Sequence, residues 1–456
     1  MHGARLIALA ALTGLAGLAA CGNADKEIDP QRQYGPNPVL PAPRQYLFPP
    51  FNVTSIVGWK NGAMPTVAPG LRIEAIATGL KHPRNVYTLP NRDILIVEGD
   101  GPGLDPYSRP KTGIQMLLEH KVKPGGAKPI NRITLVRLDA AGRPILRTVF
   151  LDHLYSPFGV VLVGSDLYVA NTNAVLRYDY TPGMTHIDAP GQVLAPLPGG
   201  PIDHHWTKSL TASPDGSSDG SKLYAGVGSN SNITENGIIA EKDRADILEI
   251  DRATGAWRHY ASGLRNPNGL TFYPGTNTLW AVVNERDELG PDLVPDYLTS
   301  IKPGAFYGWP WSYWGQHVDV RARPPRPDMV ARAIMPDYSL SSHVAPLGLA
   351  FYAGGGSLPA RFTGGAFVGE HGSWDRGVLN GYKVVFIPFA GGRPAGGPED
   401  IVSGFTASAT SAHGRPVGVT FDRTGALLVA DDAGNTIWRV TGGGNAQRAS
   451  ATVASR

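Results

Sequence analysis

The chain has 456 residues, a formal net charge of +3 and 42% hydrophobic residues, with 57 glycines and 40 prolines. This hydrophobic fraction supports a folded core, and so much glycine and proline favours many short strands and tight turns over a helical bundle. The small net charge and the lack of a Lys/Arg cluster in the sequence argue against nucleic-acid binding.

The first 20 residues have the pattern of a secretory signal. A short basic start, residues 1–5, leads into an apolar run over residues 6–20 that is too short to span a membrane. The run ends in Leu-Ala-Ala-Cys, which resembles the bacterial lipobox, so we expect cleavage before Cys21 and lipid attachment to its sulfur. This predicts a periplasmic protein held at the cell envelope membrane only by its lipid anchor; an ordinary signal peptide that contains a cysteine is the alternative.

Cys21 is the only cysteine of the chain. The sequence therefore excludes an intrachain disulfide, a Cys-x-x-Cys-His haem site and a cysteine-ligated iron–sulfur cluster. Any redox chemistry would need a bound organic cofactor, and its electrons would have to leave to a separate acceptor, a quinone or a cytochrome of the envelope.

Residues 21–70 are rich in proline and weakly periodic, which predicts a tether followed by a segment on the domain surface. The last residues, 443–456, are rich in Gly, Ala and Ser, and we expect them to be disordered.

Between these ends, one pattern recurs six times. A turn marked by glycine or proline leads into an apolar strand, and a second turn leads into a second strand. Radial repetition of this kind predicts an all-β fold, a six-bladed β-propeller over residues 71–442 in which each copy is one four-stranded antiparallel blade. Residues 71–78 are placed to complete the last blade. The copies begin near residues 83, 157, 209, 266, 345 and 415.

The spacing is widest between the fourth and fifth copies, where residues 284–344 form an insertion with the aromatic run 307–314. Insertions in propellers map to loops on one face, often the binding face. For most of the aromatic side chains, however, we expect packing of the insertion onto the blades.

His205 precedes the first strand of the third copy, where a loop would reach the central channel. A histidine there could act as a general base because its ordinary pKa lies near working pH, although a structural histidine is the simpler interpretation. Arg265 with Asn266, and Arg415, occupy matching places in the fourth and sixth copies. Convergent cations of this kind suit a ligand with several carboxylates.

An acidic loop follows the second strand of the fourth copy and contains Glu285, Arg286 and Asp287. Crowded hard oxygen ligands are what calcium needs, but a solvated charged loop has the same composition. The sequence has neither the dinucleotide-binding Gly-x-Gly-x-x-Gly pattern after a strand nor a phosphate-binding P-loop, which argues against nicotinamide, flavin and nucleotide cofactors on their usual folds.

At these positions the chain resembles the quinoprotein glucose/sorbosone dehydrogenase family, and within it the L-sorbosone dehydrogenase-like and soluble aldose sugar dehydrogenase types. The resemblance runs from about residue 70 to 441. It rests on the order of the motifs GLRNPNGL at 263–270, YGWP at 307–310, GEHGSW at 369–374 and GRP at 414–416, with His205 ahead of the third copy.

The resemblance implies a dehydrogenase acting on the CH–OH group of a sugar or sugar aldehyde, with pyrroloquinoline quinone (PQQ) over the channel and calcium bridging cofactor and protein. His205 matches the general base, and Arg265 matches a group near the reactive carbonyl. Asn266 and Arg415 match further cofactor contacts. In the calcium loop, Glu285 and Asp287 match ligands, and Arg286 could offer only its backbone carbonyl.

Two departures from the family pattern stand out. The Gly-Pro pair common in the calcium loop is displaced to residues 290–291. The lysine expected on the fifth blade is not evident at residues 371–376, so either Trp374 or Arg376 replaces it or this cofactor contact is missing.

Two other functions remain open at this point. A metal-dependent lactonase on the same fold would need channel-facing groups such as Glu98, Asn171 and Asp431 around one metal, but it would leave His205 and the arginines without a role. A binding propeller without enzymatic activity, such as an envelope scaffold, predicts no convergent base and no spectroscopic cofactor.

Overall fold

The computed structural model describes residues 27–46, 50–102, 130–214 and 220–443. The predicted lipidation site Cys21 and almost all of the predicted C-terminal tail lie outside these ranges. Within them, no helix is long and apolar enough to cross a membrane.

Six sheets of four or five strands make up the described fold. Each of the six predicted strand pairs forms the first two strands of one sheet. The first three sheets consist of β5 (Pro83–Thr88), β6 (Ile94–Glu98), β7 (Arg132–Leu138) and β8 (Pro144–Leu151); β9 (Gly159–Val163), β10 (Asp166–Ala170), β11 (Ala174–Asp179) and β12 (Gln192–Pro196); and β13 (Leu210–Ala212), β14 (Lys222–Val227), β15 (Asp246–Asp251) and β16 (Trp257–Ser262).

The other three sheets also take up strands from the N-terminal part of the chain. They consist of β17 (Asn266–Phe272), β18 (Leu279–Asn284), β19 (Pro295–Ser300), β22 (Tyr338–Ser342) and β1 (Tyr34–Gly35); β23 (Pro346–Phe351), β24 (Ala366–Glu370), β25 (Lys383–Ile387), β28 (Glu399–Ser403) and β3 (Thr66–Val67); and β31 (Pro416–Phe421), β32 (Leu427–Asp431), β33 (Thr436–Gly442) and β4 (Leu71–Ala77).

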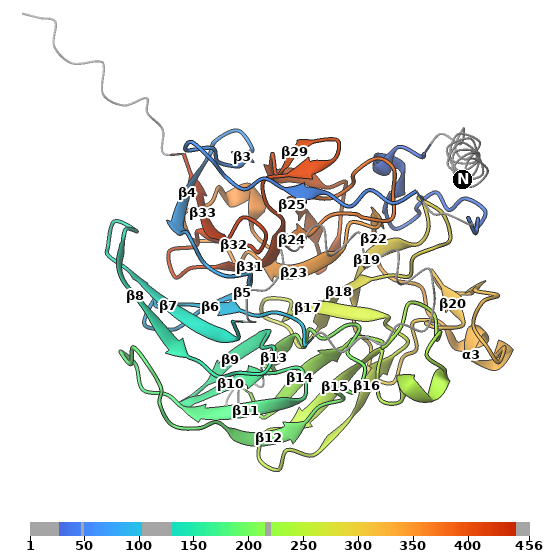
Figure 1. Ribbon diagram of the computed structural model, residues 1–456, viewed down its shortest axis with the longest axis horizontal. Coiled ribbons are helices and arrows are strands. Elements are labelled where there is room, and N and C mark those ends of the chain that lie inside the picture. Colours follow the sequence, from blue (N-terminus) through green and yellow to red (C-terminus); the bar gives the residue numbers. More distant parts are fainter. Residues whose placement is uncertain (1–26, 47–49, 103–129, 215–219, 444–456) are drawn as a thin grey trace, which may run out of the picture.

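The sheets follow one another around a common centre, in chain order, as the colours of Figure 1 show. Their first strands lie innermost and contact one another in turn, β5 with β9, then β13, β17, β23 and β31, which contacts β5 again. The all-β prediction is confirmed, and the arrangement is propeller-like.

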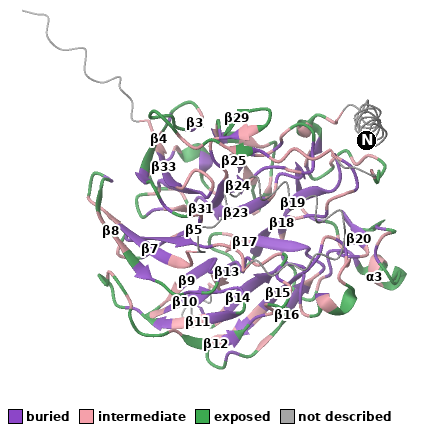
Figure 2. Cartoon of the chain, in the orientation of Figure 1, coloured by how far each residue is buried: buried purple, intermediate pink, exposed green. Residues whose placement is uncertain are grey.

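Most residues of the inner strands are buried (Figure 2), and apolar side chains pack between successive sheets. In β18, Ala281 and Val283 pack toward the third sheet, whereas Trp280 and Val282 pack toward the fifth. Because side chains alternate along a strand, a strand buried on both faces needs a continuous apolar run, and the sequence of β18 supplies one.

The sixth sheet takes its outermost strand from the other end of the chain. β4 pairs antiparallel with β33, in a register that runs from Ala77 opposite Ile437 to Leu71 opposite Gly442. This is the closing strand predicted at residues 71–78.

The N-terminal residues before β4 lie against the later sheets. β1 and β3 extend the fourth and fifth sheets, and β2 (Ser55–Ile56) pairs with β30 (Ser411–Ala412), which pairs with β29 (Thr406–Ser408). Gln33 and Thr54 are buried, so this segment is part of the packed fold.

The remaining elements lie between the sheet strands, except η1 (Pro30–Gln33), which precedes β1. The insertion carries the hairpin β20–β21 and the short helix α3, and its Tyr307, Trp309, Tyr313 and Trp314 are buried, as predicted for packing residues. These elements are β20 (Ser312–Tyr313), β21 (His317–Val318), α3 (Pro327–Arg332), β26 (Phe389–Ala390), β27 (Arg393–Pro394) and the 3₁₀ turns η1 (Pro30–Gln33), η3 (Ile238–Glu241) and η4 (Ala360–Phe362).

Candidate functional site

A cavity with about 620 Å³ of empty space, part of it open to solvent, lies where the inner strands of the third, fourth and fifth sheets begin and end. Most of its lining is polar. The lining residues are His204, His205, Arg265, Asn266, Asn284, Glu285, Asp287, Asp296, His343, Ala345 and Trp374. Six of the residues predicted from sequence are therefore brought together here.

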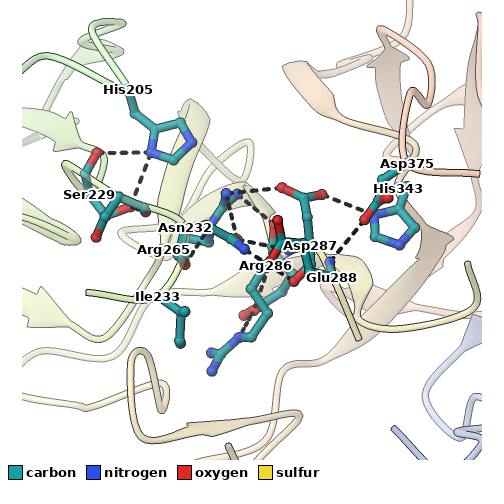
Figure 3. Close-up of polar contacts among 12 residues, drawn as sticks. His205, Ser229, Asn232, Ile233, Arg265, Arg286, Asp287, Glu288, His343 and Asp375 are labelled. Carbon is teal, nitrogen blue, oxygen red and sulfur yellow. Dashed lines mark hydrogen bonds and ion pairs between the residues drawn. The ribbon is translucent and has the colours of Figure 1, made fainter. Parts of the chain in front are cut away.

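His205 is held in one tautomer. Its Nδ1 lies 2.9 Å from the carbonyl oxygen of Ser229 and 3.1 Å from the Ser229 hydroxyl (Figure 3). Because a carbonyl oxygen can only accept, Nδ1 carries the proton and Nε2 keeps its lone pair. Burial lowers the pKa of His205 well below its ordinary value, and the charges of Arg265 and His204 lower it further. His205 is thus a neutral imidazole at the cavity, ready to accept a proton.

Arg265 is fixed at the cavity wall by the two neighbouring loops. Its Nη1 donates to the carbonyl oxygen of Glu285 at 2.6 Å, and its Nη2 donates to Asn232 Oδ1 at 3.1 Å and to Asp287 Oδ2 at 3.2 Å. Beside it, the buried Oδ1 of Asn266 has no hydrogen-bond partner among the described residues. The wall offers a rigid cation next to a polar atom that is still available to a ligand.

Buried carboxyl groups form the other side of the cavity. Asp296 accepts from the backbone N–H groups of Glu285 and Ala345, both at 2.7 Å, and burial raises the pKa of Asp296 to about 7. Glu285 Oε1 is buried without a partner among the described residues. Such oxygens are costly to bury and are satisfied by a hard cation.

Asp287, His343 and Asp375 form a second group whose polar atoms lie within 4.8 Å of one another. His343 Nδ1 lies 3.2 Å from Asp287 Oδ1, and its Nε2 lies 3.2 Å from the carbonyl oxygen of Gly290. Burial alone would lower the pKa of His343, but the Asp287 hydrogen bond and the charge of Asp375 raise it to about 9.

With both ring nitrogens donating, His343 is a cation and has no lone pair for a metal. The oxygens available to a metal in this group therefore come from the two aspartates. Asp375 Oδ1 is buried without a partner in the described chain, and burial raises the pKa of Asp375 to about 7. The donor set of the cavity fits calcium, a cation that prefers oxygen ligands.

Three of the predicted site residues do not line the cavity formed by the described residues. The Arg286 side chain is fully buried and donates to the carbonyl oxygens of Pro310 and Ser312, at 3.0 and 2.7 Å, so only its backbone is left for a ligand. Arg415 donates to the carbonyl oxygens of His371 and Gly372, at 3.0 and 2.8 Å.

Arg376 is the third of these residues. Its guanidinium binds the carbonyl oxygen of Pro291 at 2.9 Å, Asp292 at 3.1 Å and Glu27 at 3.0 Å. The geometry does not support its predicted cofactor contact, because these structural partners take up the side chain; its neighbour Trp374 does line the cavity.

Sequence reasoning did not single out His343 or Asp375 as site residues. His343 had a detectable signal, because it precedes the first strand of its sheet as His205 and Arg265 precede theirs. Asp375 lies in an irregular loop after β24, and no sequence pattern marks its direction.

Two of the three groups that a lactonase would need, Glu98 and Asp431, are used elsewhere. Glu98 accepts from Arg132 Nε at 2.7 Å, and Asp431 accepts from the ring N–H groups of Trp59 and Trp438, at 2.7 and 3.1 Å. Neither these two residues nor Asn171 is part of the described cavity lining. This geometry disfavours that alternative.

The fold and the cavity define an all-β, propeller-like protein with a polar ligand pocket at the ends of its inner strands. Residues 170–372 match the family model described as Glucose / Sorbosone dehydrogenase, and residues 328–443 match the model described as TrAA12-like. The first match includes His205, Arg265 and the acidic loop. The resemblance to the glucose/sorbosone dehydrogenase family is confirmed over that part of the chain.

Individual proteins agree with these matches. An uncharacterized protein of Borreliella burgdorferi is 32% identical over 225 residues, 49% of this chain and 58% of that protein. An aldose sugar dehydrogenase of Escherichia coli is 29% identical over 121 residues, 26% of this chain and 30% of that protein. The chain thus matches less than two thirds of the length of either relative.

A solved structure shares the fold. The holo form of the PQQ domain of pyranose dehydrogenase from Coprinopsis cinerea aligns with a TM-score of 0.64 and 19% identity, covering 85% of this chain and 100% of that domain. At this identity, the likeness concerns the fold alone.

Proposed function

We propose that this protein is a quinoprotein dehydrogenase on a six-bladed propeller, which oxidises a sugar or sugar aldehyde with PQQ and calcium and passes the electrons to an external acceptor. The matching family model, the aldose sugar dehydrogenase of Escherichia coli and the PQQ domain of Coprinopsis cinerea support the sugar class and the cofactor. The lack of any cysteine besides Cys21 supports the external acceptor.

The observation that carries the proposal is the state of His205. In a neutral imidazole whose Nδ1–H donates to a carbonyl oxygen, Nε2 is free to accept the proton of a substrate hydroxyl. A scaffold protein has no need for a desolvated, tautomerically fixed base in a polar cavity.

The cofactor would lie against Arg265, Asn266 and Trp374, because these residues line the same cavity as the base. Bound there, PQQ supplies an o-quinone that accepts hydride. Arg265 offers a fixed charge toward the carboxylates or the reduced carbonyl of PQQ. Glu285, Asp287, Asp296 and Asp375 offer the oxygens for calcium.

The test is a titration of the purified apoprotein with PQQ, with and without calcium, followed by absorbance and then by dye reduction with a panel of aldoses. We expect calcium-dependent binding and dye reduction. In His205→Ala we expect kcat to fall by about 10²- to 10⁴-fold with PQQ affinity nearly unchanged, because the base acts on the proton and not on binding.

His186→Ala is the matched control, since that side chain is 64% exposed. We expect it to keep full activity. No PQQ binding with or without calcium would refute the proposal, and so would full activity in His205→Ala.

A further inference from the structure

A second arginine, Arg244, contacts the backbone of His205 but does not line the cavity. Arg244 follows η3, in the connection between β14 and β15, and its side chain is 2% exposed. Its guanidinium donates to four acceptors: the carbonyl oxygens of Gly228 at 2.9 Å, Pro198 at 2.9 Å and His205 at 3.1 Å, and Asp203 Oδ1 at 3.3 Å.

These acceptors belong to the two segments that define the base. Pro198, Asp203 and His205 lie in the loop before β13. Gly228 immediately precedes Ser229, whose carbonyl oxygen accepts the Nδ1 proton of His205. One planar guanidinium thus fixes the backbone of the base relative to the group that sets its tautomer.

The turn that carries Arg244 is itself unusual. Asp243 and Ala245, its two neighbours, have φ angles of 60° and 55°, in the left-handed region that non-glycine residues rarely adopt. The Ala245 carbonyl oxygen accepts from the N–H of Leu264 at 3.0 Å, directly before Arg265. Backbone strain of this kind persists where the surrounding contacts hold it in place.

We infer that Arg244 is the positioning residue of the catalytic base: its four-way contact holds His205 against Ser229 so that Nε2 stays aimed at the substrate. The inference rests on the proposed function for the role of His205, and on geometry for the role of Arg244. Arg244 does not line the cavity and so acts through His205.

The charges around His205 are unevenly distributed. Arg265 and His204 line the cavity with His205. Arg244 and its ion-pair partner Asp203 lie outside that lining. The buried Nζ of Lys208 lies 3.4 Å from the His205 carbonyl oxygen and 3.2 Å from that of Trp206. Arg244 is one of the groups that lower the pKa of His205, after burial, Arg265 and His204.

Two substitutions separate the effect of Arg244 on the position of His205 from the effect of its charge on the pKa of His205. Arg244→Lys keeps the cation but cannot span four acceptors, whereas Arg244→Gln loses both. We expect kcat to fall about 10- to 100-fold in both variants with KM nearly unchanged, because a base displaced by about 1 Å loses much of its effect. We expect the acidic limb of the kcat/KM profile to move to higher pH only in Arg244→Gln.

A second readout needs no cofactor. In apoprotein labelled with ¹⁵N-histidine, the His205 resonance is assigned with His205→Gln and titrated. We expect His205 to titrate at higher pH in Arg244→Gln than in the wild type, and its tautomer to become mixed in both Arg244 variants.

Arg439→Gln is the matched control, since Arg439 is also a largely buried arginine and its partners are Asp422, directly after β31, and Glu74 of β4. It should lower stability without changing kcat or the His205 titration. Wild-type kcat and an unshifted His205 titration in a folded Arg244→Gln protein would overturn the inference. If the wild type does not bind PQQ, the proposed function is refuted, but the NMR test of Arg244 still applies.

Discussion

Glu370 is a carboxyl group buried at the end of β24, with the Tyr34 hydroxyl 3.2 Å from one of its oxygens and 3.4 Å from the other. Burial raises the pKa of Glu370 from 4.5 to about 8. The folded protein therefore holds this proton over a pH range in which the unfolded chain has released it, and the free energy of unfolding should fall as pH rises from about 4.5 to about 8.

We expect Glu370→Gln to remove this contribution, since an amide does not titrate. The difference in unfolding free energy between pH 5 and pH 8, measured by urea denaturation, should shrink by a few kcal/mol, at about 1.4 kcal/mol per pH unit. Glu399→Gln, at an exposed ion pair with a lowered pKa, should leave that difference unchanged. An equal pH dependence in wild type and Glu370→Gln would contradict this assignment.

For single residues, the sequence predicts a place in the site when the residue has a fixed position within a repeat. His205 and Arg265 precede inner strands, and the strand register brings both to one cavity. No sequence period predicts which way a side chain in an irregular loop points. Trp374 and Arg376 are two positions apart, yet one lines the cavity and the other binds Pro291 and Asp292.

At the scale of elements, the N-terminal segment supports the site from outside. The Phe51 ring stacks on the Trp374 ring with centroids 5.5 Å apart, and the Asn52 N–H donates to the Trp374 carbonyl oxygen at 2.9 Å. Proline content identified an irregular segment but not its docking site, because such docking depends on contacts hundreds of positions away.

We expect Phe51→Ala to weaken PQQ binding about two- to tenfold, because an aromatic pair contributes about 0.5–1.5 kcal/mol and its loss frees Trp374 to move. Titration of the apoprotein by absorbance measures this. Met64→Ala, at a side chain 53% exposed in the same segment, should bind PQQ as the wild type does. Unchanged affinity in Phe51→Ala would mean that the segment does not support the cavity wall.

At the scale of the whole molecule, the six repeats were readable because alternating turns and apolar strands recur along the chain. The closing strand β4 was predicted from its place ahead of the first repeat. Ile76 of this strand packs with Val86 and Ile94 of the first sheet and with Leu428 of the sixth.

We expect Ile76→Ala to lower the free energy of unfolding by about 2–5 kcal/mol, the usual cost of a cavity in a core. Because β4 links the sixth sheet to the first, the loss should appear in one transition for the whole molecule in urea or heat. Ile145→Ala, on β8 with the side chain 63% exposed, should have little effect. A local transition, or equal losses in the two variants, would argue against this closure.

The pairing of β4 with β33 also sets an order of events during synthesis. Arg439 of β33 and Glu74 of β4 are ion-paired across 365 positions of sequence. A ribosome that adds about 5–20 residues per second needs roughly 20–70 s to make that stretch. For most of that time β4 has no strand partner, because β33 is the only strand of the described sheet that pairs with it. An unpaired strand edge is a site of aggregation, so the newly made chain carries this liability at β4 until β33 emerges.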